Sequence, residues 1–258
     1  MNSQKVIVER EDHIGKIILN RPEALNALNL QMAKGINDAL SELEADRDVH
    51  VVIIKGTGRA FCAGVDIKEF SNKTALEYRS QFPALDRIIR TIPAMTKPVI
   101  AQVNGYATAA GCGIVAACDL AVASDDASFG TTAINVGLFC TGPSVPLSRC
   151  VGRKKALEML LTGDLVDARE AYRVGLVNKV VPGNELESAT MELARKLAAK
   201  SPFALQMGKQ SFYTMSDLEY NKALDYLAEI TILLAISEDY REGVAAFSEK
   251  RAPQWKGC

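Results

Sequence analysis

Runs of β-branched residues separated by polar turns recur through the first half of the chain. Residues 6–9 (VIVE) and 15–20 (GKIILN) flank the sequence REDHI, a pattern that predicts a β-hairpin. Further apolar runs at 49–56, 97–105 and 120–130 predict strands, the last of them followed by a turn.

Helical periodicity occupies the intervals between these strands. Behind Asn29, a candidate N-cap, apolar residues recur at three- and four-residue spacing, at Met32, Ile36, Leu40 and Leu43. A second helix is predicted over 84–95, ended by Pro93 and Pro98, and a short buried helix over 113–119.

From residue 151 the pattern becomes mostly helical. Residues 151–181 predict two helices and a strand, with Gly175 as the C-cap of the second helix. Four more helices are then predicted without a further strand, over 185–200, 202–213, 217–235 and 238–249. Strands that alternate with helices, followed by helices alone, are typical of an α/β core with a helical appendage.

Charge balance excludes some classes of partner. The 258 residues include 30 Lys and Arg and 31 Asp and Glu, and the basic residues do not form a block. Nucleic acid and anionic membranes are therefore not expected as main partners. No run of eighteen apolar residues predicts a membrane span, and the N-terminus MNSQKVIVEREDHIGK resembles neither a signal peptide nor a presequence. A cytoplasmic location is expected.

The cysteines and histidines do not form a recognisable metal or nucleophile motif. No CxxC pair occurs and only two histidines are present, so we expect no metal site and mostly buried, free thiols at Cys62, Cys112, Cys118, Cys140, Cys150 and Cys258. GxGxxG, P-loop and GxSxG motifs are absent. His13 and His50, the histidines available to a catalytic triad, are expected at the surface.

Two segments of small residues follow predicted strands and lead into helices. They are FCAGVD at 61–66 and ATAAGCG at 107–113. Small side chains expose backbone N–H groups, and two such groups can stabilise the negative charge that develops on a thioester oxygen. The alternative is that the small residues only permit close packing of strands and helices.

Longer motifs resemble one family. The chain is similar to the crotonase superfamily, the enoyl-CoA hydratases and isomerases, in six segments that follow the family's order: LNRPEALNALN (19–29), GRAFCAGVDIKE (58–69), KPVIAQVNGYATAAGC (97–112), CDLAVASDDASFG (118–130), LTGDLVDAREAYRVGLVNKVV (161–181) and EGVAAFSEKRAPQWKG (242–257). The resemblance implies an α/β spiral of ββα turns over residues 1–197 and a C-terminal helical trimerisation region over 198–258.

The resemblance also implies a ligand and an assembly. It implies an acyl-CoA thioester as substrate or ligand, no metal and no other cofactor, lyase or isomerase chemistry of fatty acid metabolism, and a homotrimer or a hexamer made of two trimers. The oxyanion N–H groups would belong to Val65 and Ala110. CoA contacts would come from Ala24, Ala27, Leu28, Ala63, Asp66, Ile67, Lys68 and Phe247. Asp66 suits ligand positioning or a helix N-terminus, and Lys68 either faces phosphates or is solvated.

The chain departs from the family at its carboxylates. The two glutamates typical of hydratases correspond to Gly113 and Ala133, and the acid of the isomerase branch corresponds to about Thr141. Thr131, Thr132, Asn135 and Cys140 remain near the expected site. Neutral Thr and Asn are poor bases, and a catalytic Cys140 would need a stabilised thiolate. Asp125 and Asp126 are expected in a surface turn.

Two functions remain open at this point. One is an enzyme that stabilises an enolate and uses an atypical base, poor at ordinary hydration and suited to another enolate reaction such as decarboxylation or ring closure. The other is a non-catalytic acyl-CoA-binding protein. Restoring Glu at positions 113 and 133 is expected to produce some hydratase activity if the scaffold is otherwise unchanged.

Overall fold

The core is a six-stranded sheet. The computed structural model describes residues 4–258, so the first three residues of the expected core lie outside it. The strand order is β1-β2-β3-β5-β7-β10, with β1 antiparallel to β2 and every other pair parallel. The strands are β1 (Val6–Glu11), β2 (Ile14–Leu19), β3 (Val51–Gly56), β5 (Val99–Val103), β7 (Leu120–Ser124) and β10 (Lys179–Val181). The predicted hairpin is confirmed.

A second, four-stranded sheet has the order β4-β6-β8-β9. Its strands are β4 (Ala60–Cys62), β6 (Tyr106–Thr108), β8 (Ser128–Gly130) and β9 (Val166–Asp167). The chain passes from a strand of the large sheet to one of the small sheet and then into a helix, three times in succession. This path is the predicted spiral of ββα turns. The individual short strands were not predicted, because two or three residues cannot display an alternating pattern.

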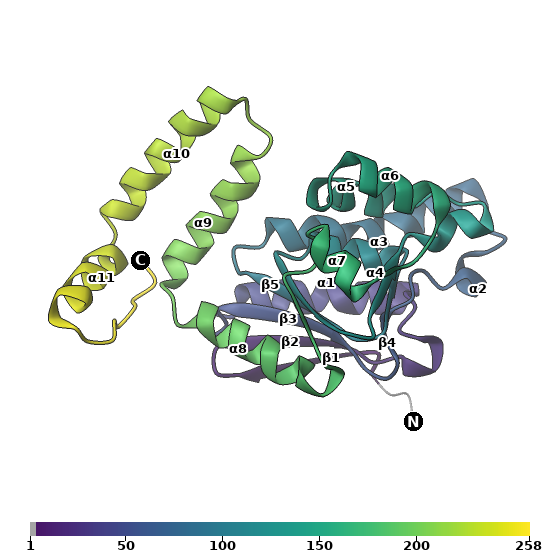
Figure 1. The fold of residues 1–258 in the computed structure, drawn as a ribbon, viewed down its shortest axis with the longest axis horizontal. Coiled ribbons are helices and arrows are strands. Elements are labelled where there is room, and N and C mark those ends of the chain that lie inside the picture. Colours follow the sequence, from purple (N-terminus) through teal and green to yellow (C-terminus); the bar gives the residue numbers. More distant parts are fainter. Residues whose placement is uncertain (1–3) are drawn as a thin grey trace.

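Helices cover both faces of the large sheet (Figure 1). Alternate β3 residues point to opposite faces, so Ile54 packs in the main core and Ile53 packs against α8 (Leu186–Ala198). The main core also contains α1 (Leu30–Ala45) and α3 (Ala75–Ala94). Asn29 accepts a hydrogen bond from the Met32 backbone, which confirms it as the N-cap of α1.

Two helices differ from the prediction. α3 begins at Ala75, nine residues before the predicted start, because Thr74 and Glu77 form a capping box. It continues one residue past Pro93. α5 (Thr141–Cys150) was not predicted, because its sequence TGPSVPLSRC has two prolines and little apolar periodicity. Pro143 is tolerated there because it lies in the first turn, where backbone N–H groups have no helical partner.

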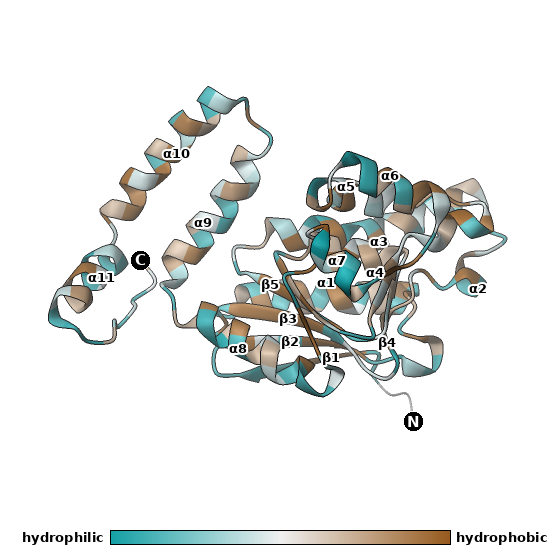
Figure 2. Ribbon diagram, viewed as in Figure 1, coloured by the Kyte–Doolittle hydropathy of each residue, from teal (hydrophilic) through white to brown (hydrophobic). Residues whose placement is uncertain are grey.

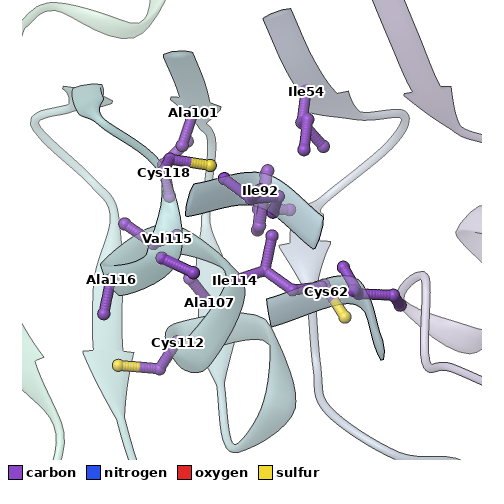
Figure 3. Close-up of a cluster of buried hydrophobic side chains, with 14 of the residues drawn as sticks. Ile54, Cys62, Ile92, Ala101, Ala107, Cys112, Ile114, Val115, Ala116 and Cys118 are labelled. Carbon is purple, nitrogen blue, oxygen red and sulfur yellow. The ribbon is translucent and has the colours of Figure 1, made fainter. Parts of the chain in front are cut away.

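The remaining helices of the core are short. α2 (Ile67–Phe70) follows β4, and α4 (Ala110–Ala117) follows β6. α4 is almost fully buried, with Ile114 and Cys112 among the core side chains drawn in Figure 3. α6 (Arg153–Thr162) and α7 (Ala168–Arg173) come next, and Gly175 adopts a positive φ of 86° just after α7, as expected near a helix end.

The C-terminal region extends away from the sheets (Figure 1). Its helices are α9 (Pro202–Met215), α10 (Tyr220–Ala235) and α11 (Glu238–Glu249), so the four helices predicted after residue 185 are confirmed. The proposed division after residue 197 lies one residue before the end of α8 and remains a prediction. Among residues 4–258, no helix combines the length and apolar character that crossing a membrane requires.

A buried ion pair attaches α9 to the core. Lys209 Nζ lies 2.7 Å from Asp119 Oδ2 and also donates to the carbonyl oxygens of Ile92 and Lys97, each at 2.8 Å. Tyr213 donates to the other Asp119 oxygen at 2.9 Å. Burial lowers the pKa of the Lys209 ammonium, although Asp119 opposes that effect.

Candidate active site

Two loops expected to contact CoA are joined by backbone hydrogen bonds. Leu28 N–H donates to the Gly64 carbonyl at 2.7 Å, and Asp66 N–H donates to the Leu28 carbonyl at 2.9 Å. Ala63 N–H donates to the Leu25 carbonyl at 3.0 Å. The structure therefore brings the segments 24–28 and 63–66 together, although they are far apart in the sequence.

A guanidinium strengthens this junction. Arg21 Nη1 lies 2.7 Å from Asp66 Oδ2 and 3.0 Å from the Ala27 carbonyl oxygen. The other Asp66 oxygen accepts the Lys68 backbone N–H at 3.1 Å, which makes Asp66 the N-cap of α2. Burial acts to raise the pKa of Asp66, but the hydrogen bond and charge of Arg21 outweigh it, so that the pKa is lowered. Asp66 is thus an ionised structural carboxylate.

Glycines allow the segment 63–66 and the start of α4 to approach each other closely. Gly64 has a φ of 99°, and a Cβ at this position would lie 2.8 Å from the Cβ of Ala109. A Cβ at Gly111 would overlap the Cys62 carbonyl oxygen. The small residues of both motifs therefore do permit close packing, as the alternative interpretation held. That packing also places Val65 and Ala110 on adjacent loops.

The two N–H groups expected to form an oxyanion hole are not used by the fold. Within residues 4–258, neither the Val65 nor the Ala110 N–H donates a backbone or side-chain hydrogen bond. Ala110 is the first residue of α4, where a helix has no internal acceptor for its N–H groups. Ala109 precedes it with φ 48° and ψ −115°, a strained conformation for a residue with a Cβ. The oxyanion hole itself remains a prediction.

The first glutamate position is filled by a neighbouring helix. Gly113 is buried in α4, and a Cβ there would lie 2.9 Å from Pro143 Cβ and 3.1 Å from Pro143 Cα. A Glu side chain would therefore require α5 to move. Ala133, at the second glutamate position, is half-buried and packs against the main core. The expectation that a glutamate at position 113 restores hydration assumed an unchanged scaffold. The contact with Pro143 means that this assumption does not hold at that position.

The polar residues expected near the site differ in their burial and in their hydrogen bonds. Thr132 begins a 3₁₀ turn over Thr132–Val136, and Asn135 in this turn lies against Gly163, with its amide 3.5 Å from that carbonyl oxygen. Thr141 is exposed at the start of α5. Cys140 is only 6% exposed, and burial raises the pKa of its thiol. Cys140 is therefore a buried thiol whose environment disfavours a thiolate. Thr131, also buried, donates to the Met159 carbonyl at 2.7 Å.

The outer CoA candidates are exposed. Ile67 and Lys68 lie on the surface of α2. Phe247 is 88% exposed on α11. α11 and α2 lie at opposite ends of the molecule (Figure 1), so Phe247 is far from the loops of its own chain. Its expected role in covering the nucleotide would require a neighbouring copy.

Asp86 was missed by sequence reasoning. It lies on α3, and its Oδ1 is 2.7 Å from the position that a Cβ at Gly142 would occupy. Gly142 is in the first turn of α5, next to the proline that packs on Gly113. Asp86 is off the apolar face of α3, and no sequence motif marks it. Only the packing of α3 against the unpredicted α5 brings it here.

Other titratable groups lie elsewhere. His13 is exposed and His50 is half-buried; their rings stack with centroids 4.6 Å apart, at the opposite end of β3 from Gly56. Asp125 and Asp126 lie in an exposed turn, as expected. Four of the six cysteines are buried, and all six are free. Hollows of about 500 Å³ between α1 and α3 and about 310 Å³ between α9 and the core include none of the loop residues above.

A comparison with models of known protein families shows to which family the chain belongs. The model of the enoyl-CoA hydratase/isomerase family matches residues 9–258. The chain belongs to the enoyl-CoA hydratase/isomerase family, within the crotonase superfamily. The resemblance that rested on six sequence segments is thereby confirmed.

Named relatives agree with this family. The enoyl-CoA hydratase domain-containing protein 3, mitochondrial, of Mus musculus is 41% identical over 248 residues, covering 95% of this chain and 82% of the relative. A crystal structure of an enoyl-CoA hydratase from Mycobacterium smegmatis superposes with a TM-score of 0.94 at 40% identity, covering 97% and 98% of the two chains. The human domain-containing protein 3 also gives 0.94 at 40% identity, with 97% and 100% covered. These structures confirm the crotonase fold.

Proposed function

We propose that the protein binds an acyl-CoA thioester and stabilises its enolate through the N–H groups of Val65 and Ala110. The observation that carries this proposal is the pair of unused N–H groups on two loops that Gly64 and Ala109 hold in contact. Removing one such donor typically slows acyl chemistry 10²–10³-fold, so the pair would supply several kcal/mol. The joined segments 24–28 and 63–66 would bind the CoA, without a metal or redox cofactor.

We propose further that ordinary enoyl-CoA hydration is slow. General acid–base catalysis contributes about 10²–10⁴-fold, and neither glutamate position has a carboxylate. Pro143 leaves no room for one at position 113 without rearrangement. The expected reaction is therefore an enolate reaction in which no water is added, and decarboxylation and ring closure belong to the same class.

A chromophoric thioester tests the proposal without requiring turnover. The absorption band of 4-dimethylaminocinnamoyl-CoA moves to longer wavelength when hydrogen bonds polarise its thioester carbonyl. We expect a red shift on binding, competition by CoA thioesters, and hydration of crotonyl-CoA slower than in the two-glutamate enzymes by at least about 10²-fold. Binding without a red shift would contradict the oxyanion proposal. Hydration at ordinary enzyme rates would contradict the proposal of slow hydration.

The second candidate is a protein that binds acyl-CoA without catalysis. The filled space beside Gly113 favours it, because the position is packed rather than vacant. The two candidates differ in proton exchange at C2 of the bound thioester. An enzyme that forms the enolate by removing the C2 proton exchanges this proton with solvent, whereas a protein that only binds the thioester does not.

The C-terminal helices support a trimeric or hexameric assembly. Within the single chain described here, residues 4–258, no α10 side chain is buried. The apolar positions of α10 and α11 are visible in brown in Figure 2, and the exposed ones include Leu224, Ile232, Leu233, Val244 and Phe247. Exposed apolar area on this scale is typical of an interface. Sedimentation velocity should give a trimer or a hexamer, and a monomer at micromolar concentration would contradict this assembly.

A cytoplasmic location is the corresponding proposal for the compartment. The vertebrate relative reported above is named as a mitochondrial protein. Fractionation of the native cells with markers for each compartment would decide between the two.

A further inference from the structure

Three carboxylates in or beside the candidate loops are already engaged, whereas Asp86 on α3 is not. Asp66 pairs with Arg21, and Glu69 accepts the Leu30 backbone N–H at 3.3 Å. Asp119 pairs with Lys209. Asp86 differs, because within residues 4–258 its side chain makes no hydrogen bond and no ion pair. It is also half-buried, and polar groups shielded from solvent usually have a hydrogen-bond partner in the protein or in an ordered water.

The surroundings of Asp86 connect it to each part of the candidate site. Its Oδ1 lies 2.7 Å from the Cβ position of Gly142, and the adjoining Pro143 packs on Gly113, one turn along α4 from Ala110. Asp86 and Gly113 therefore lie against consecutive residues of α5, Gly142 and Pro143.

The other side of Asp86 leads toward Val65. One turn earlier on α3, Phe82 packs against Phe70 of α2 with tilted rings whose centroids are 5.7 Å apart. Tyr78, a further turn away, donates to the Phe70 carbonyl at 2.8 Å. α2 begins directly after Asp66, so the face of α3 that carries Asp86 runs between the Val65 loop and the start of α5.

We propose that Asp86 is the proton carrier of the site, replacing the carboxylates absent from positions 113 and 133. This inference rests on the proposed function, because it requires a thioester held by Val65 and Ala110. A carboxylate on α3 comes from a different helix, beside the first turn of α5. It thus avoids the space that Pro143 fills at Gly113.

The step needs no co-reactant. Asp86 takes a proton from C2 of the acyl group, the C–H electron pair forms the C1=C2 bond, and the carbonyl π pair moves to the thioester oxygen. Return of the proton to C2 regenerates the substrate. With a 3-enoyl thioester, return to C4 moves the double bond from C3=C4 to C2=C3 and re-forms the carbonyl. One carboxylate suffices for this proton shift, whereas hydration also requires an activated water.

Deuterium exchange tests the assignment. With 3-hexenoyl-CoA in D₂O, we expect the wild type to incorporate deuterium at C2 and to form the 2-enoyl product, followed by mass spectrometry and ultraviolet absorbance. Asp86→Asn should lower the exchange rate about 10²–10⁴-fold. Asp86→Glu should retain part of it. Gly142→Ala should give an intermediate loss, because its Cβ displaces the carboxylate without removing it.

Matched variants separate this role from a general charge effect. Asp125→Asn removes a carboxylate from an exposed turn and should leave exchange unchanged. Asp164→Asn removes the carboxylate of an exposed residue whose backbone carbonyl oxygen lies beside Gly130, and the Gly130 carbonyl in turn accepts the Ala109 N–H. If Asp164→Asn abolishes exchange while Asp86→Asn does not, Asp164 is the carrier and the proposal is wrong.

The cinnamoyl-CoA red shift distinguishes failure of this inference from failure of the proposed function. We expect the red shift to be retained in Asp86→Asn, since the N–H groups are untouched. A red shift in the wild type without any C2 exchange would overturn the role of Asp86 and leave a thioester-binding site. Equal exchange in the wild type and Asp86→Asn would overturn it as well. Absence of the red shift in the wild type would overturn the proposed function and this inference with it.

Discussion

Arg21 and Asp66 join the segments 24–28 and 63–66, the second of which contains the candidate oxyanion residue Val65. One guanidinium nitrogen lies within 2.7 Å of the Asp66 carboxylate and 3.0 Å of the Ala27 carbonyl oxygen. Both side chains are largely shielded from solvent, so the pair is less screened than a surface salt bridge. Because Asp66 directly follows Val65, the pair also holds the backbone N–H of Val65 in place.

Arg21→Ala should loosen these loops. Hydrogen bonds to charged groups are worth about 1.5–3 kcal/mol, so we expect the free energy of unfolding to fall by about 1–3 kcal/mol and acyl-CoA affinity to fall several-fold. Urea unfolding and titration calorimetry measure the two effects. Arg10→Ala is the matched control, because Arg10 pairs with Asp46 at 2.8 Å on the surface, away from both loops. Equal losses of stability and of acyl-CoA affinity in the two variants would show that Arg21 does not specifically support these loops.

The same pair predicts an acid dependence of stability. The pKa of Asp66 is lowered in the folded protein, so its contribution is present above the unfolded value of about 3.9 and is lost as pH falls through the lower folded pKa. Asp66→Asn keeps the N-cap acceptor but removes the charge. We expect this variant to be less stable than the wild type at about pH 7 and to differ little from it at about pH 2. A constant difference across that range would contradict the assignment.

Glutamates at the two usual positions should not behave alike. Gly113→Glu forces α5 away from α4, and overpacking of this kind costs about 1–3 kcal/mol or more. Ala133→Glu adds a carboxylate at a half-buried site and should be tolerated better. Thermal unfolding compares the two. Pro143→Gly, which removes the Cβ and Cγ nearest to position 113, should recover part of the loss when combined with Gly113→Glu, and no recovery would show that the Pro143 side chain is not the obstacle.

The ion pair between Lys209 and Asp119 should determine how α9 sits on the core. Removing one partner of a buried pair costs about 3–5 kcal/mol, because the other charge remains buried. Lys209→Ala should therefore destabilise the protein and shift the assembly toward monomers, as followed by urea unfolding and sedimentation. Arg173→Ala, which removes an exposed guanidinium from its pair with Glu170 on α7, should do neither.

Sequence reasoning reached the family, the hairpin, the large-sheet strands and most helices, because long apolar runs and the six motifs carry those features. It missed α5, whose prolines hide the helical pattern, and it began α3 nine residues late, because the polar first turns show no apolar face. Because α5 was not predicted, the contact between α3 and α5 that places Asp86 beside Gly142 could not be predicted either. The oxyanion candidates Val65 and Ala110 were found only through the family motifs.

The arrangement around Gly113 also bears on how the chain can change. With Pro143 packed on the glycine, a single substitution to Glu meets a collision before it can confer any advantage. Two-carboxylate chemistry would therefore need a second change, at the start of α5, that makes room for the new side chain. The side chain that position 113 can carry thus depends on the sequence of a helix far along the chain.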